Sequence, residues 1–151
     1  MLNRIRSKSL SAAMVVALLS LLSPLSLHAA TPNYPPGSTC PLVMPFHLSG
    51  QYTASATGVI RFAMPFPATL VTVQASARAS GGTSPTLTVD VKEAGTTVLS
   101  SPVSVTAGAV SEATIADSSI ADEAVITADL TIGGTSPTWN DITIVMVFCR
   151  Q

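Results

Sequence analysis

Charged and aromatic side chains are scarce in this chain of 151 residues, at 10% and 5% of the composition. After residue 30, four basic side chains stand against eight acidic ones, which gives this part a formal charge of −4. A sparse and acidic surface cannot neutralise a row of phosphates, so nucleic acid is disfavoured as a partner. The sequence also lacks a basic amphipathic stretch, the usual signature of binding to a membrane surface.

Catalytic and cofactor motifs are lacking as well. The sequence has no Gly-x-Ser-x-Gly elbow for an acyl-transfer serine, no phosphate-binding loop and no metal-binding motif. The one histidine after residue 30, His47, lies among apolar residues. Asp122 and Glu123 could converge on Ca²⁺ with Asp117 if they lie in a loop, but a solvated acidic loop is the simpler interpretation. We therefore expect no catalytic residue, no cofactor and no metal, and a protein that is not an enzyme.

Cysteine is limited to two residues, Cys40 and Cys149. Two cysteines and a distant histidine do not form a four-ligand metal set at any usual spacing. In an oxidising compartment, two cysteines at opposite ends of a domain indicate a disulfide, although two buried free thiols are the alternative. We predict a Cys40–Cys149 bond that joins the first strand region to the last.

A long apolar run is present only near the N-terminus, and it covers 13 residues, Leu10–Leu22. A membrane-spanning helix needs about 20 apolar residues, so a retained anchor is the weaker interpretation. Basic residues precede the run, Pro24 ends it, and Ala29 and Ala30 follow, which together describe a secretory signal peptide over residues 1–30. Lipidation would need a cysteine directly after the run. We expect cleavage after Ala29 or Ala30 and an extracytoplasmic location (periplasm, cell surface or medium), with membrane contact only before cleavage.

Residues 31–39, TPNYPPGST, contain three prolines and one glycine. This composition predicts an extended arm, which serves as a linker or docks on a neighbouring molecule. The remaining residues, 40–151, are long enough for one domain with its own core.

Alternating apolar and polar residues dominate residues 40–151, and no segment has a helical period over ten residues. Val71, Val73, Ala75 and Ala77 share one face of a predicted strand, and the same period of two predicts inward faces for Leu87, Val89 and Val91, and for Ile142, Ile144, Met146 and Phe148. Further strands are expected at 59–64, 96–99, 103–105, 113–115 and 124–132, with a Glu93-Ala94-Gly95 hairpin turn. Ser118–Val125 could hold one helical turn. The pattern predicts an all-β, antiparallel, jelly-roll-like β-sandwich of about eight short strands.

The hexapeptide GGTSPT occurs twice, at residues 81–86 and 133–138. We interpret the copies as two hairpin tips with the same turn chemistry. Trp139 follows the second copy, either as an exposed platform for a carbohydrate or as a plug over the end of the core. The candidate contact residues for a ligand or partner are Gly81, Gly82, Thr83, Ser84, Gly133, Gly134, Thr135, Ser136 and Trp139.

Turns and strands follow one another in a characteristic order over residues 46–148. It is carried by Phe46-His47-Leu48-Ser49-Gly50, Arg61-Phe62, Pro65-Phe66-Pro67-Ala68-Thr69-Leu70, Leu87-Thr88-Val89-Asp90-Val91, Gly95-Thr96-Thr97-Val98-Leu99 and Ala128-Asp129-Leu130. This pattern resembles the small β-sandwich modules of tail-fibre and other virion-surface proteins of tailed bacteriophages. Those modules tend to have Gly-Asp before the late strand, where this chain has Asp122-Glu123. Phage structural proteins also assemble in the cytoplasm without a signal peptide, so the resemblance implies either a cellular surface module or an exported phage-encoded protein.

Together these features predict a secreted, non-catalytic structural or adhesive surface module. It would bind or assemble through its loops and through the arm, which could add a strand to a neighbour's sheet edge. The expected partners are further copies of the chain or a glycan on a cell surface. The alternatives are a bacteriophage virion or tail appendage protein and an extracytoplasmic glycan-binding domain.

Overall fold

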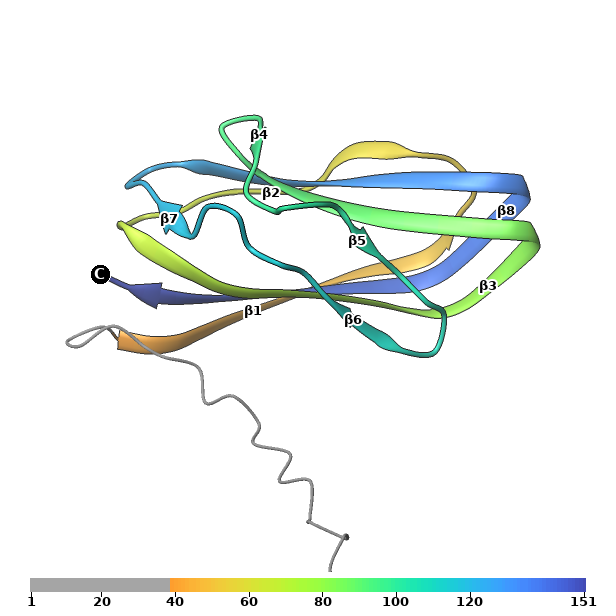
Figure 1. The fold of residues 1–151 in the computed structure, drawn as a ribbon, viewed down its shortest axis with the longest axis horizontal. Coiled ribbons are helices and arrows are strands. Elements are labelled where there is room, and N and C mark those ends of the chain that lie inside the picture. The colour runs from red at the N-terminus through yellow and green to blue at the C-terminus, as the bar shows by residue number, and fades with distance from the viewer. Residues whose placement is uncertain (1–38) are drawn as a thin grey trace, which may run out of the picture. The chain divides into compact units, whose positions relative to one another are not determined.

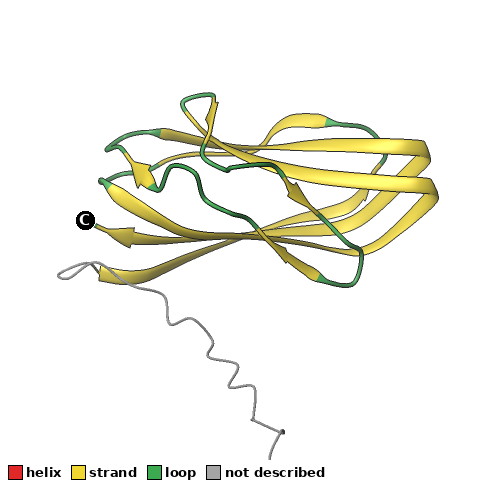
Figure 2. Cartoon of the chain, in the orientation of Figure 1, coloured by secondary structure: helices red, strands yellow, loops and turns green. Residues whose placement is uncertain are grey.

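The structure is a computed structural model that describes residues 39–151, and over this range it contains strands and no helix (Figure 2). Eight strands form one sheet in which every strand pair is antiparallel. The all-β antiparallel prediction is therefore confirmed. The predicted signal peptide lies outside the described residues, as does the predicted arm except for Thr39, which begins the first strand.

The predicted number of about eight strands is confirmed, but not all of them are short. Two of them, β3 and β8, have 26 residues each. The eight strands are β1 Thr39–Tyr52, β2 Ala56–Ala63, β3 Ala68–Glu93, β4 Thr96–Thr97, β5 Val103–Ser104, β6 Val110–Glu112, β7 Ser119–Ile120 and β8 Val125–Arg150.

β3 and β8 pair with each other along their whole length, and they bend back together at one end of the sheet (Figure 1). The bend divides the sheet into two halves that face each other. The β1 half contains residues 68–80 of β3 and 139–150 of β8, with β1, β6 and β7 beside them. The β2 half contains residues 87–93 of β3 and 125–132 of β8, with β2, β4 and β5. The β-sandwich and jelly-roll descriptions stay predictions.

The core lies between the two halves and is built from alternate residues of the long strands. Leu87, Val89 and Val91 are buried, as predicted, and so are all four predicted residues of the last strand. In the first part of β3 the prediction fails at Val71, which is half-buried, while Leu70 is buried with Val73. The register shifts between Leu70 and Thr72, and such a bulge moves the preceding side chain to the other face.

Aromatic contacts join the two halves across the core. Phe46 of β1 stacks on Phe62 of β2 with 5.4 Å between ring centroids. Phe62 in turn meets the edge of Phe148, on the β1 half, at 6.3 Å. Offset and edge-to-face pairs of this kind add about 0.5–1.5 kcal/mol beyond the area that they bury. The core is therefore continuous between β1 and β2, which both pair with β8.

The connection between residues 94 and 124 is less regular than predicted. The Glu93-Ala94-Gly95 turn is confirmed, with positive φ at Ala94 and Gly95. The strand expected at 113–115 lies instead at β6, and Ile115 forms an isolated bridge with Leu99. The helical turn expected within 118–125 is also wrong, because this segment contains β7 and an ordinary turn. β5 pairs with the β2 half, and β6 and β7 then pair with the β1 half. The sequence pattern of this connection does not reveal which half each strand joins.

Candidate functional site

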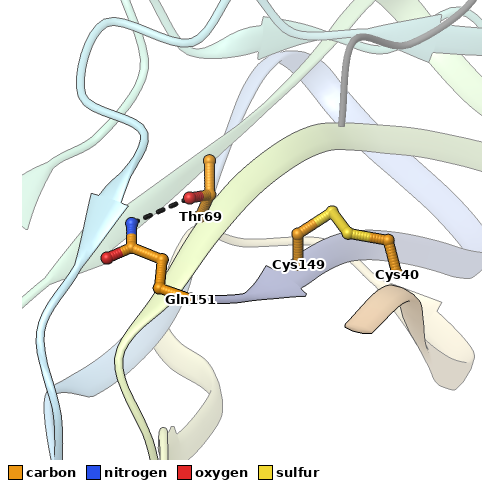
Figure 3. Close-up of a disulfide and its surroundings, with 4 residues drawn as sticks. All are labelled: Cys40, Thr69, Cys149 and Gln151. Carbon is orange, nitrogen blue, oxygen red and sulfur yellow. Dashed lines mark hydrogen bonds between the residues drawn. A yellow bond between two sulfur atoms is a disulfide. The ribbon is translucent and has the colours of Figure 1, made fainter. Parts of the chain in front are cut away.

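The Cys40–Cys149 disulfide predicted from the sequence is confirmed, with 2.05 Å between the sulfur atoms (Figure 3). It joins the start of β1 to the end of β8 across 109 positions of sequence. Figure 3 also shows the side chain of Gln151, whose Nε2 donates to Thr69 Oγ1 at 2.8 Å, while the Gln151 N–H donates to Pro67 O at 3.2 Å. Both ends of the described chain are thus attached to the same end of the sheet.

An apolar groove of about 270 Å³ lies beside this disulfide. Pro41, Leu42, Phe66 and Arg150 line it. The Arg150 guanidinium lies 5.0 Å from the centre of the Phe66 ring, a distance typical of a cation–π contact. Leu42 remains 37% exposed, and the adjacent Val43 is 51% exposed. This end of the domain therefore presents apolar surface next to Thr39, the residue at which the predicted arm ends.

The two GGTSPT copies form the opposite end of the sheet, and they do not form hairpin tips. They lie where β3 and β8 bend together (Figure 1). They pair with each other there, with Gly81 opposite Thr138, Thr83 opposite Thr135 and Thr86 opposite Gly133. This pairing has the symmetry of a two-fold axis through the bend. Gly-Gly followed by Ser-Pro does change the direction of the backbone, as predicted. The change bends two paired strands together, however, and neither copy forms a hairpin by itself.

Glycine is required at the second position of each copy. Gly82 has φ +97° and Gly134 has φ +110°, a region that L side chains rarely adopt. A Cβ on Gly134 would lie 2.6 Å from Ser84 O, and a Cβ on Gly82 would overlap Ser136 O in the equivalent contact. The two copies approach each other closely because neither carries a side chain at this point.

The pairing brings eight of the predicted contact residues together. Gly82, Thr83, Ser84, Gly134, Thr135 and Ser136 are exposed, whereas Gly81 and Gly133 are half-buried. Trp139 is only 2% exposed and belongs to the core, so the core-plug interpretation holds and the exposed platform does not. Its Nε1–H has no acceptor within residues 39–151. A sugar stacked on Trp139 is incompatible with this burial.

A hollow of about 550 Å³, with several polar side chains in its lining, lies on the outer face of the β1 half. The strand register places His47, Thr143, Ser76 and Val110 side by side across β1, β8, β3 and β6. Their neighbours Ile142, Ile144 and Ala77 are buried in the core, so these four side chains point outward. Ala77, Arg78, Gly108, Ala109 and Asp141 complete the lining.

Asp141 is fixed in this hollow by two donors. Gly50 N–H donates to Oδ1 at 3.0 Å, and Arg78 Nε donates to Oδ2 at 2.6 Å. These contacts lower the pKa of Asp141 below its ordinary value of 3.8. The hydrogen bond from the Gly50 N–H has the largest effect, followed by that from Arg78, and the nearby His47 acts in the same direction. On the other wall, His47 Nδ1 lies 3.0 Å from Thr143 Oγ1.

A comparable clamp, meaning an aspartate held by one backbone N–H and one basic side chain, lies on the β2 half. Asp129 accepts a hydrogen bond from Lys92 Nζ at 2.8 Å and another from the Gly58 N–H at 2.7 Å. Lys92 contributes most to lowering the pKa of Asp129, followed by Gly58, and Asp129 in turn raises the pKa of Lys92. The two aspartates of β8 thus hold a backbone N–H of β1 on one half of the sheet and a backbone N–H of β2 on the other.

The acidic residues considered for calcium do not converge. Asp117 Oδ1 accepts from the Ser119 N–H at 3.0 Å, while Asp122 and Glu123 are exposed in a turn. Across residues 39–151, no three histidine, cysteine or acidic residues are grouped closely enough to hold a metal. The same range has no helix with the length and hydropathy needed to cross a bilayer.

Sequence reasoning missed the outer-face hollow, because its lining comes from four separate segments. The one available signal was the placement of His47 and Thr143 on the outward positions of their strands. Comparisons of the chain with protein-family models, curated proteins and solved structures gave no significant match.

Proposed function

We propose that this protein is an extracytoplasmic, non-catalytic structural and adhesive surface module that assembles with further copies of itself. The Cys40–Cys149 bond supports this proposal, since structural disulfides persist in oxidising compartments outside the cytoplasm. Such a bond also suits a module that must resist unfolding without chaperones. The proposed assembly uses the disulfide end of the domain and the arm that precedes it.

The observation that carries the proposal is the groove formed by Pro41, Leu42, Phe66 and Arg150, which lies beside the start of β1. We propose that it receives residues 31–38 of a neighbouring copy. This segment contains three prolines and Tyr34, and proline-rich segments dock in grooves lined by aromatic side chains. Fully extended, eight residues reach about 25 Å, far enough to cross to an adjacent molecule.

Docking through side chains suits this chain better than the strand addition expected from the sequence. β1 and β2 each pair with β8 alone among the described strands, so both have a free edge. β1, however, contains Pro41 and Pro45, which lack the N–H that an added strand would need. The arm has the same deficiency at its three prolines. Few ladder hydrogen bonds could form between them.

Light scattering on the purified chain at several concentrations tests the proposal. We expect a mass that is a multiple of the monomer, and a monomer when residues 31–38 are deleted. Leu42→Ser should weaken the assembly, since Leu42 lines the groove and is already partly exposed. Val110→Ser is the matched control, because Val110 is an exposed valine that does not line the groove. A native chain that is monomeric at every concentration would contradict the proposal, as would a deletion that leaves the mass unchanged.

The bacteriophage appendage alternative shares this fold and this assembly, and differs in where the protein is found. Recovery of the chain from purified virions would favour it, whereas recovery from the envelope or medium of virus-free cells would favour the cellular module. The glycan-binding alternative gains support from the outer-face hollow and not from Trp139.

A further inference from the structure

We propose that the outer-face hollow binds an acidic carbohydrate, with the sugar carboxylate held between Arg78 and His47. This inference deepens the adhesive part of the proposed function and rests on it, while the assembly part is independent. The hollow's volume of about 550 Å³ lies within the range of ordinary ligand sites.

The charged groups of the hollow are arranged to accept an anion. Both oxygens of Asp141 are occupied, one by the Gly50 N–H and one by Arg78 Nε. The Arg78 side chain is 73% exposed, and its terminal nitrogens have no partner within residues 39–151. A guanidinium held at one nitrogen and open at the others presents the fork that matches a carboxylate.

The remaining lining suits a sugar ring better than a small inorganic anion. The hydroxyls of Ser76 and Thr143 can each donate and accept, as sugar hydroxyls require. Val110 is 69% exposed at the side of the hollow and offers an apolar surface to the C–H face of a ring. Gly108 and Ala109 are small, so a ligand can approach the backbone there. Asp141 is the only acidic residue in the lining, although the domain as a whole is acidic.

Titration of the ¹⁵N-labelled chain, followed by amide chemical shifts, tests this site. The probes are a trimer of galacturonic acid, a neutral galactose trimer and sodium sulfate. We expect the galacturonate trimer to shift amides at 76–78, 108–110 and 141–143, and to bind at least about tenfold more tightly than either other probe. Equal affinity for sulfate would reduce the site to a simple anion site and contradict the proposal. Shifts at 82–84 and 134–136 would contradict it too, by placing the ligand at the bend.

Three variants locate the interaction. Arg78→Gln should weaken galacturonate binding about tenfold or more, and Arg78→Lys should restore part of it. His47→Gln is a second, independent variant at an exposed position of β1 and should weaken binding severalfold. Arg61→Gln removes an exposed arginine of β2 that lies outside the lining, and it should bind as the native chain does. Native affinity in Arg78→Gln would overturn the proposal.

The chain that lacks residues 31–38 separates this inference from the assembly. If that chain is monomeric and still binds galacturonate, both proposals hold. If the native chain is already monomeric and binds, the assembly fails and the carbohydrate site stands. Loss of binding in a monomeric but folded deletion variant would contradict a site formed within one copy.

Discussion

Gly82 and Gly134 occupy equivalent positions on the two paired copies of GGTSPT, and each lies against the backbone of the other copy. The two 26-residue strands can therefore bend together without separating. This contact fixes the point at which one continuous sheet folds over its own core.

Alanine at either glycine should destabilise the domain strongly. Gly82→Ala and Gly134→Ala each place a Cβ against backbone oxygens and also require a left-handed φ. We expect each variant to lower the free energy of unfolding by about 2–4 kcal/mol. Gly108→Ala is the control, because its φ is +76° but its Cβ would meet no atom within 4 Å, so only about 1 kcal/mol should be lost. Urea unfolding measures all three, and a loss at Gly108 as large as at the bend would contradict this account.

The disulfide should contribute a large share of the stability. Cys40→Ala combined with Cys149→Ala opens a loop closed across 109 positions, which chain-entropy estimates value at about 4–5 kcal/mol. Measured losses of native disulfides are about 2–5 kcal/mol, and we expect a value in that range. Denaturant unfolding of the double variant against the oxidised native chain gives the number. If the double variant and the native chain unfold at the same denaturant concentration, the pairing of β1 with β8 is sufficient to hold β1 without the disulfide.

Stability should fall in acid because of the two clamping aspartates. The pKa values of Asp129 and Asp141 are lower in the folded chain than their ordinary value of 3.8. Their stabilising effect is therefore complete above about pH 4 and is lost as the pH falls through the lowered values. Lys92 has a raised pKa, so its contribution is complete below pH 10.5 and is lost above it.

Asp129→Asn tests this pH dependence. It should cost about 1 kcal/mol at neutral pH and should flatten the fall of stability below pH 4. Asp122→Asn serves as the control, since Asp122 lies exposed in a turn and has no ion pair or hydrogen bond within residues 39–151. Thermal unfolding between pH 2 and pH 7 distinguishes the two. An Asp129→Asn variant with the native acid profile would show that the clamp does not act on stability.

Much of the fold followed from the period-two pattern, because one buried face per strand is a local property. Leu87, Val89 and Val91 illustrate this, as does the Ala94-Gly95 turn, where two positive φ angles suit a tight hairpin. The bend could not be predicted in the same way. Gly-Gly followed by Ser-Pro indicates a change of direction, but not whether the chain pairs with itself or with a distant copy.

The candidate sites were harder to predict than the fold. The pattern after Gly133 could not decide whether Trp139 is exposed, because its burial depends on both halves of the sheet. The outer-face hollow depends on register between strands that are far apart in sequence, such as His47 with Thr143. The disulfide was predictable because the chain has a single pair of cysteines and a predicted signal peptide.

The most direct test of the central claim, an exported and disulfide-closed surface module, is intact-mass spectrometry of the protein recovered from its own cells under non-reducing conditions. The cell fraction must be recorded. We expect a chain that begins at Ala30 or Thr31, is two hydrogens lighter than its reduced form, and is found in the envelope or the medium. A full-length chain with two free thiols in the cytoplasm or in purified virions would contradict it.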